Sequence, residues 1–248
     1  MTVKRILIAQ PAPTNGVSPY TELAHKYKLQ IEFQPFVHVE GVSVKAFRAQ
    51  RIDILAHTAV VFVSRTGIDH FFLLCEEMRI TVPESMKYFC MTEAIALYLQ
   101  KYIIYRKRKI FFGNGTIESI IGSIGTKHKG ETFLLGFANN SKPEFVKAFE
   151  KAKMKHTKAV LYCTVDSDLT KLDLSHYDLL AFYSSADVKS LVNNFPTFKQ
   201  NNLLLAAFGP STLKALKAAK LKAAIQAPTP EAPSMAKALE LFLAAAKK

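Results

Sequence analysis

Short runs rich in β-branched and aromatic residues alternate with amphipathic runs along the whole chain of 248 residues. This alternation predicts strands connected by helices, the arrangement that builds parallel sheets covered by helices. The runs predicted as strands are 5–9, 29–37, 60–63, 87–91, 110–112, 131–137, 158–165, 179–183, 203–208 and 222–226. We therefore expect an α/β protein, and its length favours two domains.

The layout also repeats within the chain. Residues 61–64 read Val-Phe-Val-Ser ahead of an amphipathic run, and residues 181–184 read Ala-Phe-Tyr-Ser ahead of another, which places Ser64 and Ser184 120 residues apart. At the next strand-to-helix junction, Thr92 and Thr212 are again 120 residues apart. Two matches at one offset indicate two similar halves.

Hydroxyl residues stand where predicted strands lead into predicted helices. In open parallel sheets, ligands bind beyond the carboxyl ends of strands, where helices begin and offer unpaired backbone N–H groups. Any one of Ser64, Thr92, Ser184 and Thr212 is typical of an ordinary helix N-cap. Four of them at matching places favour surfaces that receive anions such as carboxylates or phosphates.

The charge balance points to an anionic partner, since 33 Lys and Arg residues oppose 20 Asp and Glu residues for a net charge of +13. The densest basic run is Arg106 to Lys109, beside Tyr102 and Tyr105. It suits either a nucleic-acid patch or a solvated helix end, and we favour the helix end. An RNA-binding module is a weaker alternative, because the chain lacks glycine and aromatic motifs interleaved on a strand.

Several function classes are disfavoured by missing motifs. The sequence has no GxGxxG motif, phosphate loop, signal-peptide pattern or apolar run long enough for a membrane span. Its three cysteines, Cys75, Cys90 and Cys163, are widely spaced in apolar runs, and its seven histidines show no ligand spacing. We expect a cytoplasmic protein without a disulfide, a metal or a cofactor, and without nucleic acid or membrane as a partner.

In its last third the chain resembles the uroporphyrinogen-III synthase family. The matching segments keep the family's order and spacing: a strand with Tyr followed two residues later by Thr, a strand ending in Phe-x-Ser, and a Gly-x-x-Thr element with a trailing Pro-Thr. They are residues 160–165, 179–185 and 206–212, with 227–230 behind the last. Weaker similarity runs through the first half, including Gly113-Asn114-Gly115.

The resemblance implies two similar α/β domains, each a parallel sheet flanked by helices, with a ligand cleft between them. One domain is discontinuous and comprises residues 1–36 and 166–248, and residues 40–162 form the inserted domain. Two β-rich connections, near 36–41 and 162–167, join the domains side by side as a hinge. Neither connection has the composition of a flexible Gly/Ser linker.

The activity implied by the resemblance is the dehydrating cyclisation of hydroxymethylbilane to uroporphyrinogen III, with inversion of the last pyrrole ring, in tetrapyrrole (heme) biosynthesis. The enzyme is a lyase, acts without a cofactor and is expected to be a monomer. Tyr162 matches the family's proton donor. The expected substrate-binding residues are Ser64, Arg65, Thr92, Asn114, Ser184, Ser185 and Thr212.

One departure from the family keeps an alternative open. The family's Thr-Arg-Pro after the first strand is replaced by Ala9-Gln10-Pro11. Because an arginine suited to an anionic substrate is missing there, a non-catalytic two-domain binding protein for an anionic small molecule is the second interpretation.

Overall fold

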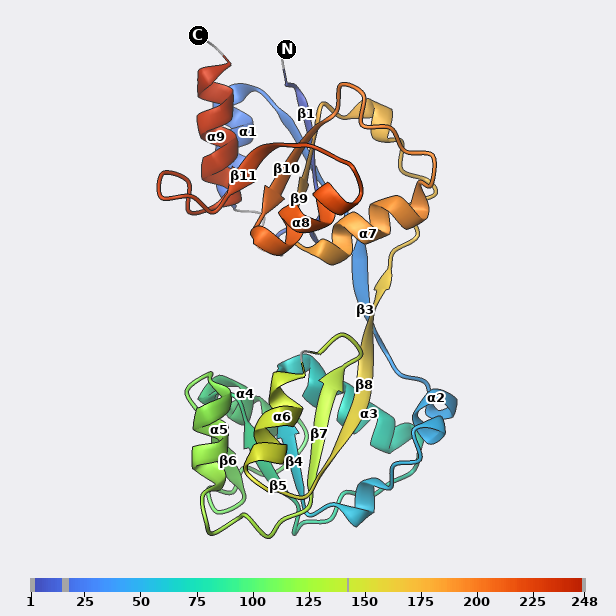
Figure 1. Cartoon of the computed structure of the whole chain (residues 1–248), viewed down its shortest axis with the longest axis vertical. Helices are drawn as coiled ribbons and strands as arrows, with labels where there is room; N and C mark the ends of the chain where they lie inside the picture. The colour runs from blue at the N-terminus through green and yellow to red at the C-terminus, as the bar shows by residue number, and fades with distance from the viewer. Residues whose placement is uncertain (1–2, 15–17, 142, 247–248) are drawn as a thin grey trace. The chain divides into compact units, whose positions relative to one another are not determined.

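The chain forms two compact units, which we describe one at a time. The structure is a computed structural model that describes residues 3–14, 18–141 and 143–246. Unit 1 comprises Met1–His38 and Val165–Lys248, and unit 2 comprises Val39–Thr164 (Figure 1). The chain leaves and re-enters unit 1 within two strands, β3 (Val37–Gly41) and β8 (His156–Asp166), which are neighbours in one sheet.

Unit 1 is built on a five-stranded sheet with the order β11-β10-β9-β1-β2. Each neighbouring pair in this sheet is parallel. The first strand thus shares a sheet with segments near 179–208, as predicted. The strands are β1 (Arg5–Ile8), β2 (Gln30–Phe33), β9 (Leu179–Phe182), β10 (Leu204–Phe208) and β11 (Ala223–Ala227).

Helices cover both faces of this sheet because successive strand side chains point to opposite faces. Ile6 and Ile8 belong to a buried cluster with residues of α1 and α9, whereas Leu7 belongs to a cluster with residues of α7 and α8. In Figure 1, α1 and α9 lie side by side. The helices are α1 (Pro19–Tyr27), α7 (Ser185–Asn194), α8 (Pro210–Ala218) and α9 (Met235–Ala245), with a short 3-10 helix η3 (Leu174–His176).

Unit 2 has a six-stranded sheet with the order β3-β8-β7-β4-β5-β6. The pairs β8/β7, β7/β4, β4/β5 and β5/β6 are parallel. Their carboxyl ends therefore meet at one edge of the sheet. The remaining strands are β4 (Ala59–Phe62), β5 (Lys87–Cys90), β6 (Ile110–Phe112) and β7 (Phe133–Ala138).

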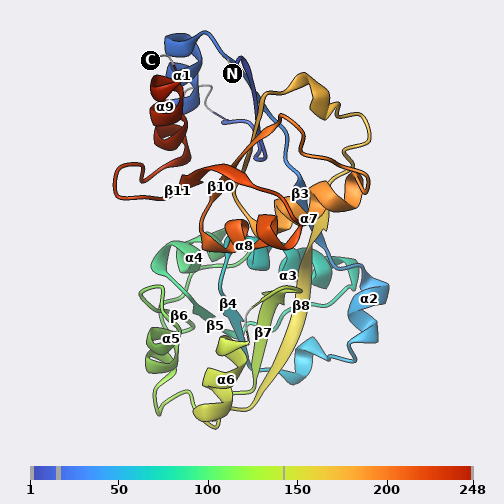
Figure 2. The same ribbon diagram turned by 45° about the horizontal axis from the view of Figure 1, so that its top comes forward.

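The second sheet is also covered on both faces. Val60 and Phe62 pack with residues of α2, α3 and α4, whereas Ala59 and Val61 pack with residues of α5 and α6. Figure 2 shows α2 and α3 set apart from α5 and α6 around this sheet. The elements are α2 (Val44–Ala49), α3 (Arg65–Glu77), α4 (Glu93–Tyr98), α5 (Ile117–Ile124) and α6 (Glu144–Lys151), with 3-10 helices η1 (Ile54–Ala56) and η2 (Leu99–Lys101).

The two units repeat one plan with a shifted starting point. The order β8-β7-β4-β5-β6 in unit 2 corresponds to β2-β1-β9-β10-β11 in unit 1. In unit 1 the segment β1-α1-β2 comes first along the chain, and in unit 2 its counterpart β7-α6-β8 comes last. The predicted fold class, two similar α/β domains with parallel sheets flanked by helices, is confirmed.

The offset of 120 residues holds for only part of the repeat. Asp53 and Asp173 both cap 3-10 helices, and Ser64 and Ser184 both cap the helix after the matching strand. At the next junction the N-cap of α4 is Thr92 but the N-cap of α8 is Gly209, an offset of 117. The predicted equivalence of Thr92 and Thr212 is therefore wrong, because α7 has 10 residues where α3 has 13.

Each predicted strand is observed, and its ends differ from the predicted ends by no more than two residues, with one exception. The run 29–37 is divided into β2, which ends at Phe33, and β3, which begins at Val37. Pro35 stands in the break. Because proline has no backbone N–H to give to a neighbouring strand, a continuous central strand is disfavoured there.

Candidate active site

Five of the expected site residues belong to unit 2, and four of these follow the carboxyl ends of adjacent strands. Ser64 and Arg65 follow β4, Thr92 follows β5, and Asn114 follows β6. Since these strands are parallel neighbours, the residues line one edge of the sheet. The fifth, Tyr162, lies in β8, which is separated from β4 by β7.

Tyr162 and Ser64 meet directly despite the strand between them. The Tyr162 hydroxyl lies 3.0 Å from Ser64 Oγ, and the Tyr162 residue is only 9% exposed. Ser64 Oγ also accepts the Gly67 N–H of the first turn of α3 at 3.0 Å. One serine oxygen thus connects the phenol to the positive end of a helix. The serine hydroxyl is able to accept the amide proton and still donate its own proton to the tyrosine oxygen.

The tyrosine ring is packed against α3. His70 stacks on the ring of Tyr162, with ring centroids 5.6 Å apart and 24° between the planes. On the same helix, a Cβ added at Gly67 would lie 3.7 Å from Tyr162 Cε1, so the backbone of α3 closes on the ring edge. From the sequence, His70 is one of seven histidines without ligand spacing and has no predicted role. The signal that was available is its position three residues after Gly67, which puts both on one helix face.

Arg65 is the only Lys or Arg residue of α3. It is exposed, occupies the first residue of the helix, and has its guanidinium carbon 5.4 Å from the centre of the Tyr98 ring. The Tyr98 hydroxyl donates to both oxygens of Asp69 at 2.9 Å, and Lys101 donates to Asp69 at 2.8 Å. Burial disfavours ionisation of Asp69, but the hydrogen bonds from Lys101, Tyr102 and Tyr98 outweigh it and lower the pKa of this carboxyl.

Helix dipoles make the position of Arg65 unfavourable for the helix itself. A helix N-terminus attracts negative charge and disfavours a cation, by about 0.3–1 kcal/mol at an exposed site. The first turn of α3 has no acidic residue to compensate. A bound anion would supply that compensation.

Thr92 and Asn114 use their side chains for local structure. Thr92 Oγ1 accepts the Ile95 N–H at 3.4 Å as the cap of α4. The exposed Asn114 accepts the Thr116 hydroxyl at 2.9 Å and the Thr116 N–H at 3.3 Å, just before α5. Both side chains are therefore ordered at the strand ends, and each keeps further hydrogen-bonding capacity.

In unit 1, the expected residues Ser184 and Ser185 lie at the start of α7. Ser184 Oγ accepts the Asp187 N–H at 3.2 Å, and the Asp187 carboxylate accepts the N–H groups of Ser184 at 2.7 Å and Tyr183 at 3.2 Å. This reciprocal pair is a capping box. Burial raises the pKa of Asp187, and the hydrogen bonds only partly oppose that shift.

Thr212 lies in the interior of unit 1. The residue has no exposed surface, and its hydroxyl donates to the Phe208 carbonyl at 2.7 Å. The start of α8 nearby is exposed at Pro210 and Ser211. A ligand at this junction would meet the helix start rather than the Thr212 hydroxyl.

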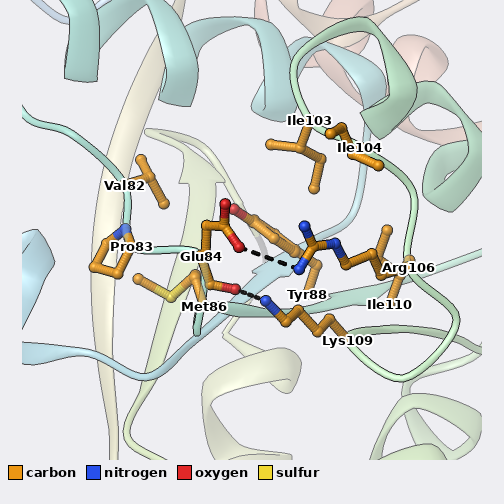
Figure 3. A pocket seen from close by; sticks show the side chains of 10 residues that line it. All are labelled: Val82, Pro83, Glu84, Met86, Tyr88, Ile103, Ile104, Arg106, Lys109 and Ile110. Carbon is orange, nitrogen blue, oxygen red and sulfur yellow. Dashed lines mark hydrogen bonds and ion pairs between the residues drawn. The ribbon is translucent and has the colours of Figure 1, made fainter.

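The basic run Arg106 to Lys109 lies at the opposite edge of the unit 2 sheet. It borders a hollow of about 150 Å³ that includes Tyr88 and Ile110, near the amino ends of β5 and β6 (Figure 3). Arg106 pairs with the Glu84 carboxylate at 3.1 Å, and Lys109 donates to the Glu84 carbonyl. Two cations of the run thus pair with Glu84, away from the strand ends described above.

Within the described ranges, residues 3–14, 18–141 and 143–246, no group of three or more His, Cys, Asp or Glu side chains is placed to hold a metal ion. Nor does any helix in that part of the chain have the length and apolar character needed to cross a membrane.

Comparisons with known proteins were made for both sequence and structure. The structure of uroporphyrinogen-III synthetase from Helicobacter pylori is similar, with a TM-score of 0.58 and 15% identity over 98% of this chain and 99% of that chain. A mutant uroporphyrinogen III synthase from the extremely thermophilic bacterium Thermus thermophilus gives a TM-score of 0.53 and 17% identity, also over 98% and 99%. These likenesses support the two-domain fold. A search of curated proteins found no matching sequence.

A family model provides the more specific match. The model described as uroporphyrinogen-III synthase HemD matches residues 18–237, most of the chain. The resemblance read from the sequence is thereby confirmed. The chain belongs to the uroporphyrinogen-III synthase family, whose members are lyases of tetrapyrrole biosynthesis.

Proposed function

We propose that the chain converts hydroxymethylbilane into uroporphyrinogen III by dehydrating cyclisation with inversion of the last pyrrole ring. The observation that carries the proposal is the contact of 3.0 Å between the hydroxyls of Ser64 and Tyr162 at the start of α3. It supports a positioned proton donor at the carboxyl edge of a parallel sheet, where ligands of such folds bind.

The first chemical step is loss of the terminal hydroxyl group as water. The C–O bond breaks, the oxygen takes a proton, and electrons from the pyrrole nitrogen form the azafulvene cation. In our proposal the Ser64 hydroxyl donates to the Tyr162 oxygen, which leaves the phenolic proton for the departing oxygen. The negative charge left on Tyr162 is stabilised by the serine hydrogen bond and by the positive end of α3.

Ring closure then regenerates the donor. The terminal pyrrole attacks the azafulvene carbon through its substituted α-carbon and forms a spiro intermediate. The bond from that α-carbon to its old bridging carbon then breaks, and the bridging carbon bonds to the free α-position of the same pyrrole, which inverts this ring. The proton lost from the free α-position on rearomatisation restores Tyr162. One substrate gives one product and one water, and no electrons are gained or lost. The protein's main task is to fold the linear tetrapyrrole into the productive geometry, for which binding contacts suffice.

The substrate's acetate and propionate arms make it an octacarboxylate, so carboxylate binding is the second requirement. The net charge of +13 favours such a ligand. In unit 2 we assign carboxylate binding to Arg65, with Ser64, Thr92 and Asn114 contributing polar groups at the neighbouring strand ends. In unit 1 we assign it to the hydroxyls of Ser184 and Ser185 and to the start of α8 next to Thr212, where backbone N–H groups are the donors.

The direct test is the isomer that the purified protein makes. Hydroxymethylbilane, freshly produced by its own enzyme, cyclises without help to the type I isomer, so the ratio of type III to type I product measures catalysis. We expect type III to predominate and its yield to scale with protein concentration. Type I product alone, formed at the rate seen without protein, would overturn the proposal. Calorimetric binding of the substrate in that case would favour the non-catalytic binding protein.

We also propose a monomer that works in the cytoplasm. Light scattering behind a sizing column should give a mass near 27.7 kDa. A mass of twice that value would contradict the monomer, and fractionation of cells tests the location.

A further inference from the structure

The ring of His70 occupies a slot lined by two neighbours, Gly41 at the end of β3 and Tyr162 in β8. A Cβ added at Gly41 would lie 2.8 Å from His70 Nδ1 and 3.3 Å from its Cε1. The imidazole also stacks on the phenol ring, with centroids 5.6 Å apart. A side chain at residue 41 would therefore force the imidazole to move from its position on the tyrosine ring.

Simple packing does not account for an imidazole in this slot. His70 Nδ1 is buried and has no hydrogen-bond partner among the described residues. An unpaired buried polar atom costs free energy, and an aliphatic side chain of similar volume would fill the slot without that cost. A flat ring, however, is able to lie face to face with the phenol and limit the swing of that ring toward the imidazole.

We infer that His70 is a positioning residue that holds the Tyr162 hydroxyl at Ser64, and that Gly41 is required to let it do so. The inference rests on the proposed function, in which Tyr162 donates the proton. The phenolic oxygen lies at the far end of the ring from Cβ, so a small swing of the whole ring about the Cα–Cβ bond moves it away from Ser64 Oγ, 3.0 Å distant. Misplacement by about 1 Å is enough to lower a rate by about a hundredfold.

The test begins with His70→Leu, which keeps apolar volume in the slot but removes the flat face. We expect kcat to fall about tenfold with KM within twofold of wild type, because the proposed function assigns carboxylate binding to other residues. The melting temperature should stay close to that of wild type. A fall in kcat that follows the loss of folded protein, measured by circular dichroism at the assay temperature, would overturn the inference.

Two double-mutant cycles, in which kcat is measured for single and double variants, then test whether His70 acts through Tyr162 and whether Gly41 acts through His70. In a Tyr162→Phe background, His70→Leu should change the residual turnover less than twofold, because no hydroxyl remains to be positioned. Gly41→Ala should lower kcat in the wild-type background and have little effect in the His70→Leu background. If the fold-decreases in kcat of the two single variants multiply in the double variant of both cycles, the residues act independently and the inference is overturned.

The same cycle separates this inference from the proposed function. If Tyr162→Phe alone turns over at the wild-type rate, the assignment of Tyr162 as proton donor is wrong, and the positioning of its hydroxyl has no catalytic meaning. If Tyr162→Phe is slow but His70→Leu lowers kcat equally with and without the hydroxyl, the donor stands and only the positioning is wrong.

Discussion

The junctions β4–α3 and β9–α7 begin alike and then differ at the third helical residue. Each has a serine cap, Ser64 or Ser184, whose oxygen accepts an N–H from that third residue. In unit 1 the third residue is Asp187, whose carboxylate closes the capping box. In unit 2 it is Gly67, which has no side chain that could accept the N–H of the capping serine. The serine oxygen there contacts Tyr162 instead.

Under the proposed function, the difference gives one local structure two purposes. At β9–α7 the Asp187 carboxylate already accepts the N–H groups of Ser184 and Tyr183, so the capping box contributes to stability and leaves mainly the serine hydroxyls for a ligand. At β4–α3 the acidic cap is missing and a cation, Arg65, stands where unit 1 has Ser185. The second junction is less favourable in isolation but better suited to bind an anion and to move a proton.

The tyrosines at the two junctions differ in the same way. In unit 1, the hydroxyls of Tyr20 and Tyr183 contact one another. Burial raises the pKa of both phenols, and their mutual hydrogen bond adds to the increase for Tyr20. A phenol with a raised pKa is a poorer proton donor, so the pair suits a packing role. Tyr162 instead contacts a serine at a helix N-terminus.

The largest expected effect comes from deleting one hydroxyl at each junction. Tyr162→Phe should lower turnover at least tenfold while leaving KM and the melting temperature nearly unchanged, because a positioned acid contributes about a hundredfold or more and the ring is kept. Tyr183→Phe is the matched control and should keep turnover within twofold. Steady-state assays of type III product measure both. Equal decreases in turnover for Tyr162→Phe and Tyr183→Phe would contradict a functional difference between the two junctions.

Arg65 offers the next largest effect. Arg65→Gln should raise KM about fivefold and leave kcat within twofold, since it removes a charge that in our proposal binds substrate carboxylates away from the reacting atoms. It should also weaken the dependence of KM on salt, because screening acts on the interaction that was deleted. Ser185→Ala, at the matching position of unit 1, should change KM less. A salt dependence identical to wild type would remove Arg65 from the binding site.

The sequence was sufficient for the fold but not for all of the candidate site. Strand positions were predictable because apolar runs of the right length alternate with amphipathic ones, and only Pro35 divided a run that looked continuous. The equivalence of Thr92 and Thr212 failed because a constant offset cannot reveal that α7 is shorter than α3. His70 escaped notice because its partner Tyr162 is 92 residues away (70 to 162), and a contact across strands leaves no local pattern.

A smaller effect distinguishes the two threonines. Thr212→Val deletes a hydroxyl that donates to the Phe208 carbonyl in the protein interior, and it should lower the free energy of unfolding by about 1 kcal/mol. Turnover and KM should be unchanged if α8 contributes backbone groups alone. Thr92→Val removes a cap of the exposed helix start and should raise KM as well. Urea unfolding and steady-state kinetics separate these outcomes, and a kinetic defect in Thr212→Val without loss of stability would assign its hydroxyl to the substrate.

The smallest expected effect is a pH dependence at the capping box of unit 1. Burial raises the folded-state pKa of Asp187 above the unfolded value of about 3.9, so its protonated form is favoured by folding. The contribution of protonated Asp187 to the free energy of unfolding, measured against Asp187→Asn, is therefore fully present below about pH 3.9. This contribution is lost as the pH rises through the folded-state pKa. Asparagine accepts the same two N–H groups without a charge. The difference in free energy of unfolding should therefore shift in favour of Asp187→Asn between about pH 4 and pH 7.

Asp187→Ala, which loses the acceptor, should be less stable than wild type by about 1 kcal/mol. A shift in the opposite direction would mean that the carboxylate is held in its charged form, as a bound substrate carboxylate would be at β4–α3.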